Sequence, residues 1–223
     1  DKQIVLNAYL RNTADQRSIV QDGAVCDGVT NDGPAIQATI NNCIAQQCKV
    51  LIPKSVNGCI VDTDTSPLTV TGIGLIIEGV SSQNSRIQAT GSGSVFTVTN
   101  ADSVVFRDFR IRNIVSTGKW LIRLDLSRNT TITSMILANS STWPKALNTA
   151  DSGGIFVDND SFAARIIGNT FAGTQGDSAA ILLKNNGGAG TSIIGNRFDG
   201  VSAAAGGEAI QVISRGNVIA GNV

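Results

Sequence analysis

Short segments that alternate apolar and polar residues recur along most of the chain and predict β-strands. In such a segment successive side chains point to opposite faces, so one face is apolar and packs inward. Gly, Ser, Asn and Asp separate the segments, as is typical of turns. The clearest examples are Phe96-Thr97-Val98, Ile122-Arg123-Leu124, Ile155-Phe156-Val157, Ile181-Leu182-Leu183 and Ile210-Gln211-Val212.

A second motif repeats in step with these strands, as in Ile166-Ile167-Gly168-Asn169 and Ile193-Ile194-Gly195-Asn196. Strands in units of 26 to 30 residues predict coils of a parallel β-helix. An Asn at the same place on every coil predicts an internal ladder of hydrogen-bonded side-chain amides. The predicted ladder residues are Asn113, Asn139, Asn169, Asn196 and Asn222.

One segment near the N-terminus has helical periodicity instead. Asp32 is the predicted N-cap and Pro34 lies in the first turn. The apolar face that follows consists of Ile36, Ile40, Cys43 and Ile44. Because an open solenoid end exposes core and strand edges, this helix is the expected lid. The predicted fold is an all-β, right-handed parallel β-helix with a short N-terminal capping helix: lead-in and helix over 1–48, coils over 49–223. The stop at Val223, within a repeat, favours truncation of a longer parent; coverage by another chain is the alternative.

The composition limits which partners and which catalytic groups the chain can have. Charged residues make up 15% of the chain, and 17 Lys+Arg balance 17 Asp+Glu. A neutral chain without a basic block argues against nucleic acid as a partner, and no apolar run has the length of a membrane helix. Because there is no His, catalysis would rest on carboxylates, Lys, Arg, Tyr or thiols, and neither a metal site nor a cofactor is expected.

All four cysteines lie within the first 59 residues, at Cys26, Cys43, Cys48 and Cys59. Their spacing fits no zinc site. The preferred interpretation is buried thiols in the cap, and disulfides are the alternative.

The segment Gly23–Asp32, followed by Ala35-Ile36-Gln37-Ala38, resembles the opening motif of the pectate-lyase-like β-helix superfamily. The superfamily includes phage tailspikes, polysaccharide lyases, glycosidases and epimerases. The lead-in Leu10-Arg11-Asn12-Thr13 and Arg17-Ser18-Ile19 resembles that of phage tailspikes in particular. The resemblance implies a homotrimeric tailspike in the virion tail, or otherwise a secreted protein, that acts on bacterial capsule or O-antigen polysaccharide. The motif is specific for the fold and says little about the reaction.

Counting residues from each carboxylate to the next strand indicates which carboxylates lie on neighbouring coils. Asp151 and Asp177 each lie four residues before the first inward residue of a strand, and Glu208 lies two residues before Ile210. Neighbouring coils are about 4.8 Å apart, which suits the paired carboxylates of a glycosidase. Asp151, Asp177 and Glu208 are therefore the catalytic candidates. The alternative for the aspartates is a turn residue bonded to its own backbone, and for Glu208 a solvated surface residue.

A second column contains Asp125, Asp158 and Lys184. Of these, Asp158 and Lys184 are candidate substrate-binding residues. Trp143, in the longest inserted turn, is a candidate sugar-stacking surface, with packing against the coil as the alternative.

Phe156 and Leu182 are predicted to point outward, one above the other. Adjacent large apolar side chains on an outer face suggest a partner such as a second copy in a trimer, and a covering loop is the alternative. The function hypotheses are a polysaccharide-hydrolysing tailspike, a non-catalytic β-helical shaft or receptor-binding segment, and a cellular polysaccharide lyase of the same fold.

Overall fold

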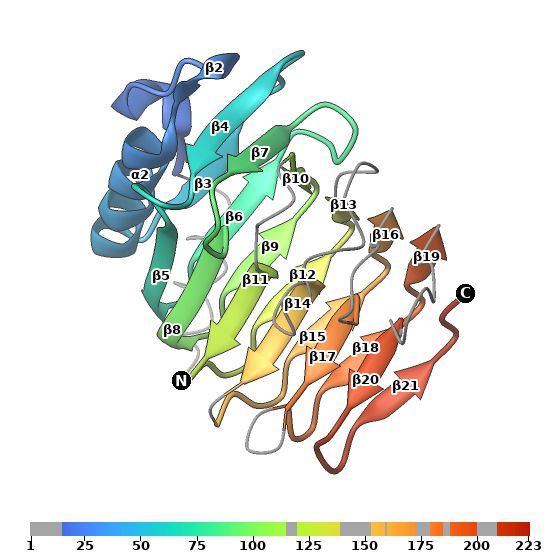
Figure 1. The fold of residues 1–223 in the computed structure, drawn as a ribbon. Coiled ribbons are helices and arrows are strands. Elements are labelled where there is room, and N and C mark those ends of the chain that lie inside the picture. Colours follow the sequence, from blue (N-terminus) through green and yellow to red (C-terminus); the bar gives the residue numbers. More distant parts are fainter. Residues whose placement is uncertain are drawn as a thin grey trace.

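The computed structural model describes residues 15–114, 120–138, 153–158, 160–172, 179–184, 188–199 and 209–223. This part of the chain is an all-β parallel β-helix of about six turns with a short N-terminal helix, which confirms the predicted fold class (Figure 1). Each full turn gives one strand to each of three parallel sheets, called sheets A, B and C.

Within each sheet, neighbouring strands come from successive turns. Sheet A contains β1 (Gln16–Ser18), β3 (Lys49–Ile52), β6 (Ile76–Gly79), β9 (Val105–Arg107), β12 (Thr131–Thr133), β15 (Arg165–Ile167), β18 (Ser192–Ile194) and β21 (Val218–Ala220). Sheet B contains β2 (Asp27–Asn31), β4 (Gly58–Asp62), β7 (Arg86–Thr90), β10 (Arg110–Asn113), β13 (Ile136–Ala138), β16 (Thr170–Ala172) and β19 (Arg197–Asp199). Sheet C contains β5 (Leu68–Ile73), β8 (Phe96–Asp102), β11 (Trp120–Asp125), β14 (Gly153–Asp158), β17 (Ile181–Leu183) and β20 (Ile210–Val212).

The core lies inside the three sheets and is built from the alternate residues that the sequence pattern places inward. Ile122 and Leu124 of β11 pair with Ile155 and Val157 of β14, and all four side chains are fully buried. Burying an aliphatic side chain of this size stabilises the fold by about 1.5–3 kcal/mol. The five apolar-x-apolar segments predicted as strands all belong to sheet C.

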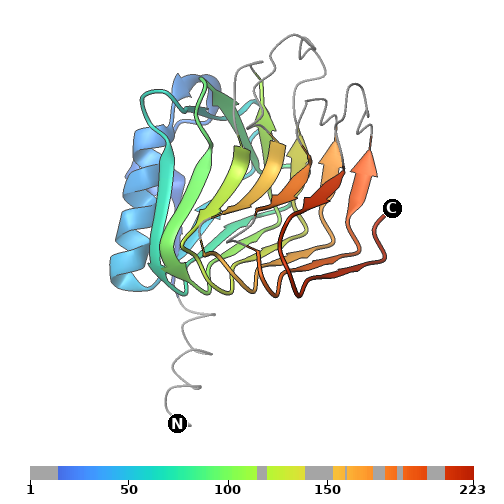
Figure 2. The ribbon, with the colours of Figure 1, turned by 60° about the horizontal axis from the view of Figure 1, so that its bottom comes forward.

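Helix α2 (Gly33–Gln46) covers the N-terminal end of the stack, as predicted (Figure 2). Ile36, Ile40 and Cys43 are fully buried on its inner side. Gln37 bonds to β5, the edge strand of sheet C: its Nε2 donates to the Thr69 carbonyl at 2.9 Å, and its Oε1 accepts from the Thr69 N–H at 2.7 Å. One side chain therefore supplies, at Thr69, the two bonds that a preceding strand would make there, and helps to cover the sheet edge.

Asp32 stands at the predicted N-cap position, but its predicted capping role is wrong. Its buried carboxylate does not bond to the helix; it accepts from the backbone N–H groups of Val25, Cys26 and Ile60 at 2.7–3.3 Å. The first helical N–H donates to the Asn31 side chain instead, at 3.1 Å. The carboxylate thus serves two backbone donors of the loop before β2 and one of strand β4, because these buried N–H groups need an acceptor.

The preferred interpretation of the cysteines as free thiols is wrong. Cys26 is bonded to Cys59, and Cys43 to Cys48. The first disulfide joins strand β4 to the residue before β2, and the second joins the last turn of α2 to the residue before β3. Both therefore tie the capping region to the first coils.

The predicted asparagine ladder is confirmed for its last three members. The Asn196 Oδ1 accepts bonds from the backbone N–H and the side-chain amide of Asn169, at 2.9 and 3.0 Å. Asn222 accepts the equivalent two bonds from Asn196, at 2.9 and 3.0 Å. The spare amide hydrogens bond to the carbonyls of Ile132 and Ile166. The glycine before each ladder Asn has a positive φ of 62–63°, which bends the chain from sheet A into sheet B.

Asn113 does not belong to this ladder, which corrects the sequence alignment. Arg110 pairs with Ile136, and Ile136 with Thr170, so the ladder position on the Asn113 coil is Phe109. Asn113 lies four residues further on, at the end of β10, and is buried. Asn139 itself lies outside the described residues, but the same register places Met135 at the ladder position of its coil, where the Met135 N–H donates to the Asn169 Oδ1 at 3.0 Å. The prediction that Asn139 belongs to the ladder is therefore wrong as well.

The outward pair on sheet C is adjacent, as predicted, because Phe156 pairs with Leu182 in register. It does not form an exposed apolar patch. Phe156 is 3% and Leu182 8% exposed, in a small cluster with Trp120 and Ala179. The pair is covered within a single chain, so it carries no argument for a partner.

The predicted division between a lead-in over 1–48 and coils over 49–223 stays a prediction. In the described part of the chain, α2 has neither the length nor the hydropathy to cross a bilayer.

Candidate functional site

The outer face of sheet C carries a charged column next to an aromatic cluster. Asp125 of β11 pairs in register with Asp158 of β14. Lys184 follows directly after Leu183, the partner of Val157, and its N–H donates to the Val157 carbonyl. The structure therefore confirms that Asp125, Asp158 and Lys184 lie in this order on successive coils.

Arg123 connects the two carboxylates of this column. Its Nη2 lies 3.3 Å from the Asp158 Oδ2 and 3.7 Å from the Asp125 Oδ2. All three side chains are at most one third exposed. Screening by water is therefore partial, and the two ion pairs fix the side chains relative to one another. Sequence reasoning placed the aspartates but missed Arg123; the signal was a charged residue between two inward apolar residues.

Phe156 forms the centre of the aromatic cluster beside this column. The Trp120 ring stacks on it with centroids 5.0 Å apart. The Arg123 guanidinium lies 5.4 Å and the Lys184 ammonium 5.7 Å from the ring centroid, both within cation–π range. The ring thus fixes one arginine and one lysine on the outer face. Gly153 allows this packing, since a Cβ there would lie 2.3 Å from the Trp120 ring.

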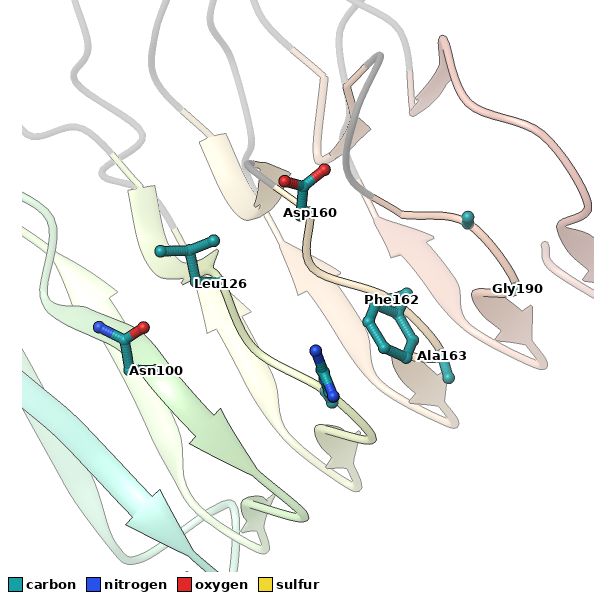
Figure 3. A pocket seen from close by; sticks show the side chains of 8 residues that line it. Asn100, Leu126, Asp160, Phe162, Ala163 and Gly190 are labelled. Atoms are coloured by element: carbon teal, nitrogen blue, oxygen red, sulfur yellow. The ribbon is translucent and has the colours of Figure 1, made fainter.

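A groove runs along the corner where the chain leaves sheet C for sheet A (Figure 3). It has a cavity volume of about 720 Å³, within the usual range of ligand clefts. Its lining comes from β8 itself and from the segments that follow the next three strands of sheet C, β11, β14 and β17. The lining residues are Asn100, Leu126, Arg128, Asp160, Phe162, Ala163, Ala189 and Gly190.

An aromatic ring with a cation over it lies in this groove. The Arg128 guanidinium is 4.8 Å from the centroid of the Phe162 ring, and Phe162 is 38% exposed. A parallel β-bridge joins Arg128 and Phe162, so the two residues occupy equivalent positions on neighbouring coils. Asp160 projects from the same segment as Phe162, two residues after Asp158. The groove thus offers an apolar ring, a cation and a carboxylate to a ligand.

Asp102 lies beside the groove on the first of these coils. Hydrogen bonds from Asn129 and Ser103, together with the charge of Arg128, hold the pKa of Asp102 below its usual range. The corner therefore has a carboxylate beside the groove, in addition to the Arg128 and Asp160 side chains that line it.

The structure leaves the predicted catalytic residues untested. Asp151, Asp177, Glu208 and the stacking candidate Trp143 lie outside the described residues. The strands that Asp151, Asp177 and Glu208 precede are β14, β17 and β20 of sheet C. The substrate-binding candidates Asp158 and Lys184 lie on that sheet's outer face, and their binding role stays a prediction.

One group of possible metal ligands occurs among the described residues: Cys26, Asp32 and Cys59. A thiolate is the form of cysteine that binds metals, and these two sulfurs are joined in a disulfide. The Asp32 carboxylate is also already bonded to backbone donors. The group is a structural part of the cap.

Comparison with known proteins gives a fold and no family. No protein-family model and no curated protein sequence matches the chain. Solved structures do match. The chain resembles ORF18 of Geobacillus virus E2 with a TM-score of 0.70 and 15% identity, over 97% of this chain and 43% of that one. It resembles a putative glycosyl hydrolase from Parabacteroides merdae with a TM-score of 0.70 and 11% identity, over 94% of this chain and 98% of that one.

The Dettilon tailspike protein gives a TM-score of 0.66 and 16% identity, over 93% of this chain and 39% of that one. The chain thus spans well under half the length of the two viral proteins and nearly all of the Parabacteroides protein. Identities this low show the fold alone. The predicted likeness to tailspike and glycosyl hydrolase β-helices is confirmed at that level.

Proposed function

We propose that this β-helix binds a bacterial surface polysaccharide, capsule or O-antigen, along the corner groove and the adjoining outer face of sheet C. The observation that carries the proposal is the groove itself, with the half-exposed Phe162 ring beside Arg128 and Asp160. A sugar ring offers an apolar face to an aromatic side chain and hydroxyls to charged ones. A groove that crosses four coils suits a long, repeating ligand.

The proposal assigns hydrolysis of the bound glycan to Asp151, Asp177 and Glu208. The support is their spacing before three consecutive strands of sheet C. Carboxylates about 5 Å apart serve a retaining glycosidase, and those about 6.5–9.5 Å apart serve an inverting one.

The non-catalytic alternative is compatible with one observation. In the described part of sheet C, Asp125 and Asp158 are both engaged by Arg123. A carboxylate pair held by a guanidinium suits binding of a glycan as well as it suits chemistry on one.

The test of binding uses a panel of purified capsule and O-antigen polysaccharides with wild type, Phe162→Ala and Arg128→Gln. We expect each substitution to weaken binding roughly tenfold, because each removes a contact of about 1–2 kcal/mol. Ile73→Ala and Arg165→Gln are matched controls, since both residues are exposed on the surface outside the groove. Equal binding by all five proteins would contradict the assignment of the groove.

The test of cleavage measures reducing-end release by wild type, Asp151→Asn, Asp177→Asn and Glu208→Gln. Loss of an acid or base is expected to slow cleavage by about 10²–10⁴-fold at unchanged melting temperature. Asp199→Asn, on the outer face of sheet B, is the control. A product that absorbs in the near ultraviolet would identify a lyase instead. Binding without cleavage by wild type would identify a shaft or receptor-binding segment.

The proposal includes a place in a phage tail and assembly as a homotrimer. Its support is the fold shared with a tailspike protein and with a viral ORF product. Light scattering at micromolar concentration tests the trimer, and a monomer would contradict it.

A further inference from the structure

The outer face of sheet B carries a cluster of three arginines, Arg86, Arg110 and Arg112. Arg110 of β10 pairs in register with Arg86 of β7, the neighbouring strand in sheet B (Figure 1). Arg112 lies two residues further along β10, on the same outer face, because Ile111 between them points into the core. All three side chains are half-buried. The three cations are therefore neighbours on one surface.

Among the described residues, these three arginines lack the carboxylate partners that four other arginines have. Arg17, Arg107, Arg123 and Arg197 each form an ion pair with Asp or Glu. No acidic residue of the described chain forms an ion pair with any member of the cluster. Like charges held side by side repel one another, so the cluster is unfavourable until an anion binds to it.

Arg110 shows this most clearly. Its Nε is buried and has no hydrogen-bond partner in the described structure. Burial, with the charges of Arg112 and Arg86, lowers the pKa of Arg110 from its ordinary value. A buried donor without an acceptor is costly, and such groups mark places where a ligand supplies the missing bond.

Arg86 is held in place, whereas Arg112 makes no such bonds. The Arg86 guanidinium donates to the carbonyls of Val56 and Gln83 at 3.2–3.3 Å. No hydrogen bond from the Arg112 side chain occurs among the described residues. Within the part of the chain that the structure describes, the cluster thus combines one fixed guanidinium, Arg86, with two guanidinium groups that make no side-chain hydrogen bond to protein.

We propose that Arg86, Arg110 and Arg112 form an anion site that binds an acidic group of the glycan, a carboxylate, phosphate or sulfate on a sugar. Guanidinium groups match these anions because two parallel N–H bonds fit two oxygens. The inference rests on the proposed function and narrows it: the polysaccharide carries negative charge, and it touches sheet B as well as sheet C.

The experiment compares binding of dextran and carboxymethyl-dextran of equal length, which differ only in carboxylates. Wild type is expected to bind carboxymethyl-dextran better than dextran at low salt. Arg110→Gln and Arg112→Gln should each weaken that binding about tenfold or more and flatten its dependence on NaCl, since fewer charges are paired. Arg165→Gln is the matched control. It is an exposed arginine on an outer strand face, but its strand neighbours are Thr131 and Ser192 rather than cations.

Melting temperature separates binding from structure. Arg110→Gln should melt at the same temperature as wild type or slightly higher, because it removes the repulsion between Arg110 and the two neighbouring cations. Lower melting of both Arg110→Gln and Arg112→Gln would make the cluster structural and overturn the proposal. Equal binding of the two dextrans by wild type would also overturn the proposal. So would a loss of carboxymethyl-dextran binding in Arg165→Gln as large as in the cluster variants. Tighter binding of duplex DNA than of carboxymethyl-dextran, lost in the same variants, would overturn the glycan assignment.

The outcomes also distinguish this site from the proposed function. Bacterial polysaccharide binding that depends on Phe162 but not on Arg110 would leave the proposed function intact and remove the anion site. Carboxymethyl-dextran binding that depends on Arg110, without binding of any bacterial polysaccharide, would support the anion site and contradict the proposed function.

Discussion

The first coils and the later coils of this β-helix satisfy their buried polar groups by different means. At the N-terminal end of the described stack, helix α2 takes the place of a neighbouring coil, and unlike side chains complete it: Asp32 accepts from three backbone N–H groups, and Gln37 bonds to the edge strand β5. In the later coils one residue type at one position repeats, and Asn169, Asn196 and Asn222 bond to one another. Where like coils stack, the same residue on each coil can therefore supply the hydrogen-bond partners of the next. At the end of the stack, each buried polar group needs a different partner.

The cross-links follow the same division. Both disulfides lie in the capping region or the first full coil, and the described part of the later coils has no cysteine. The first coils are thus held by covalent bonds and single side-chain contacts, and the later ones by the ladder and the core.

The largest expected effect is in the ladder. Asn196→Ala should lower the free energy of unfolding by about 3–5 kcal/mol, because it leaves buried groups of both neighbouring coils without partners. Urea denaturation measures this. Asn84→Ala is the control. The Asn84 side chain is exposed and its amide donates to Ser81 of the same turn, so the change should stay within about 0.5 kcal/mol. A loss below about 1 kcal/mol for Asn196→Ala would mean that the ladder is not what holds the later coils.

The disulfides should differ in their effects by loop length. Cys26 and Cys59 are 33 residues apart, and Cys43 and Cys48 are 5 apart. Loop-closure entropy assigns about 3.7 kcal/mol to the longer loop and about 2 kcal/mol to the shorter. Chemical denaturation of the two double Cys→Ala variants tests this order. A larger loss for the Cys43–Cys48 pair would contradict the entropic account and indicate a packing role in α2.

The Asp22 ion pair should make the cap sensitive to acid. Hydrogen bonds from Arg17, and in addition from Thr39 and Asn42, lower the pKa of Asp22 to about 2. Because the folded pKa is below the unfolded value of about 3.9, the stabilisation is complete above pH 4 and is lost as the pH falls toward 2. We expect a loss of about 1–2 kcal/mol over that window, since the pair is partly screened by water.

Urea denaturation at pH 2 to 5 measures this effect. Asp22→Asn should remove the part of the pH dependence of the unfolding free energy that comes from Asp22. Asp199→Asn should leave that dependence as in wild type, because the Asp199 ion pair is exposed. Parallel pH curves for wild type and Asp22→Asn would show that Asp22 does not anchor the cap.

The smallest effect concerns the sheet edge. Gln37→Ala should cost about 1 kcal/mol, because it removes both bonds to Thr69. Gln37→Glu keeps the acceptor and should fall between wild type and alanine. Gln46→Ala, an exposed position on the same helix, is the control in thermal melting. Equal melting of Gln37→Ala and Gln46→Ala would remove the edge-covering role.

Much of the fold could be predicted from local pattern. The period-2 segments placed Ile122 and Ile155 inward, and counting from them placed Asp125, Asp158 and Lys184 on adjacent coils. The misplacement of Asn113 shows the limit. Chain segments of different length join the strands, so counting from one motif to the next does not give the register of a sheet.

The candidate site was predictable only in part. Asp158 and Lys184 were found because a strand fixes their direction, but the groove around Phe162 was not. Phe162 follows β14 in a turn, where side-chain direction depends on left-handed residues such as Asp160 and Ala163, whose φ values are 52° and 56°. Strand alternation does not extend through such a turn.

The sequence by itself determined the parallel coils, their inward face and the covering helix, because each follows from the local period of apolar and polar residues and from its repetition along the chain. Only the tertiary structure decided which cysteines pair, which asparagines meet, that Trp120 covers Phe156, and that Arg86 and Arg110 lie side by side. Each of these depends on the register between neighbouring coils. That register is set by packing of the whole stack, and a local pattern does not contain it.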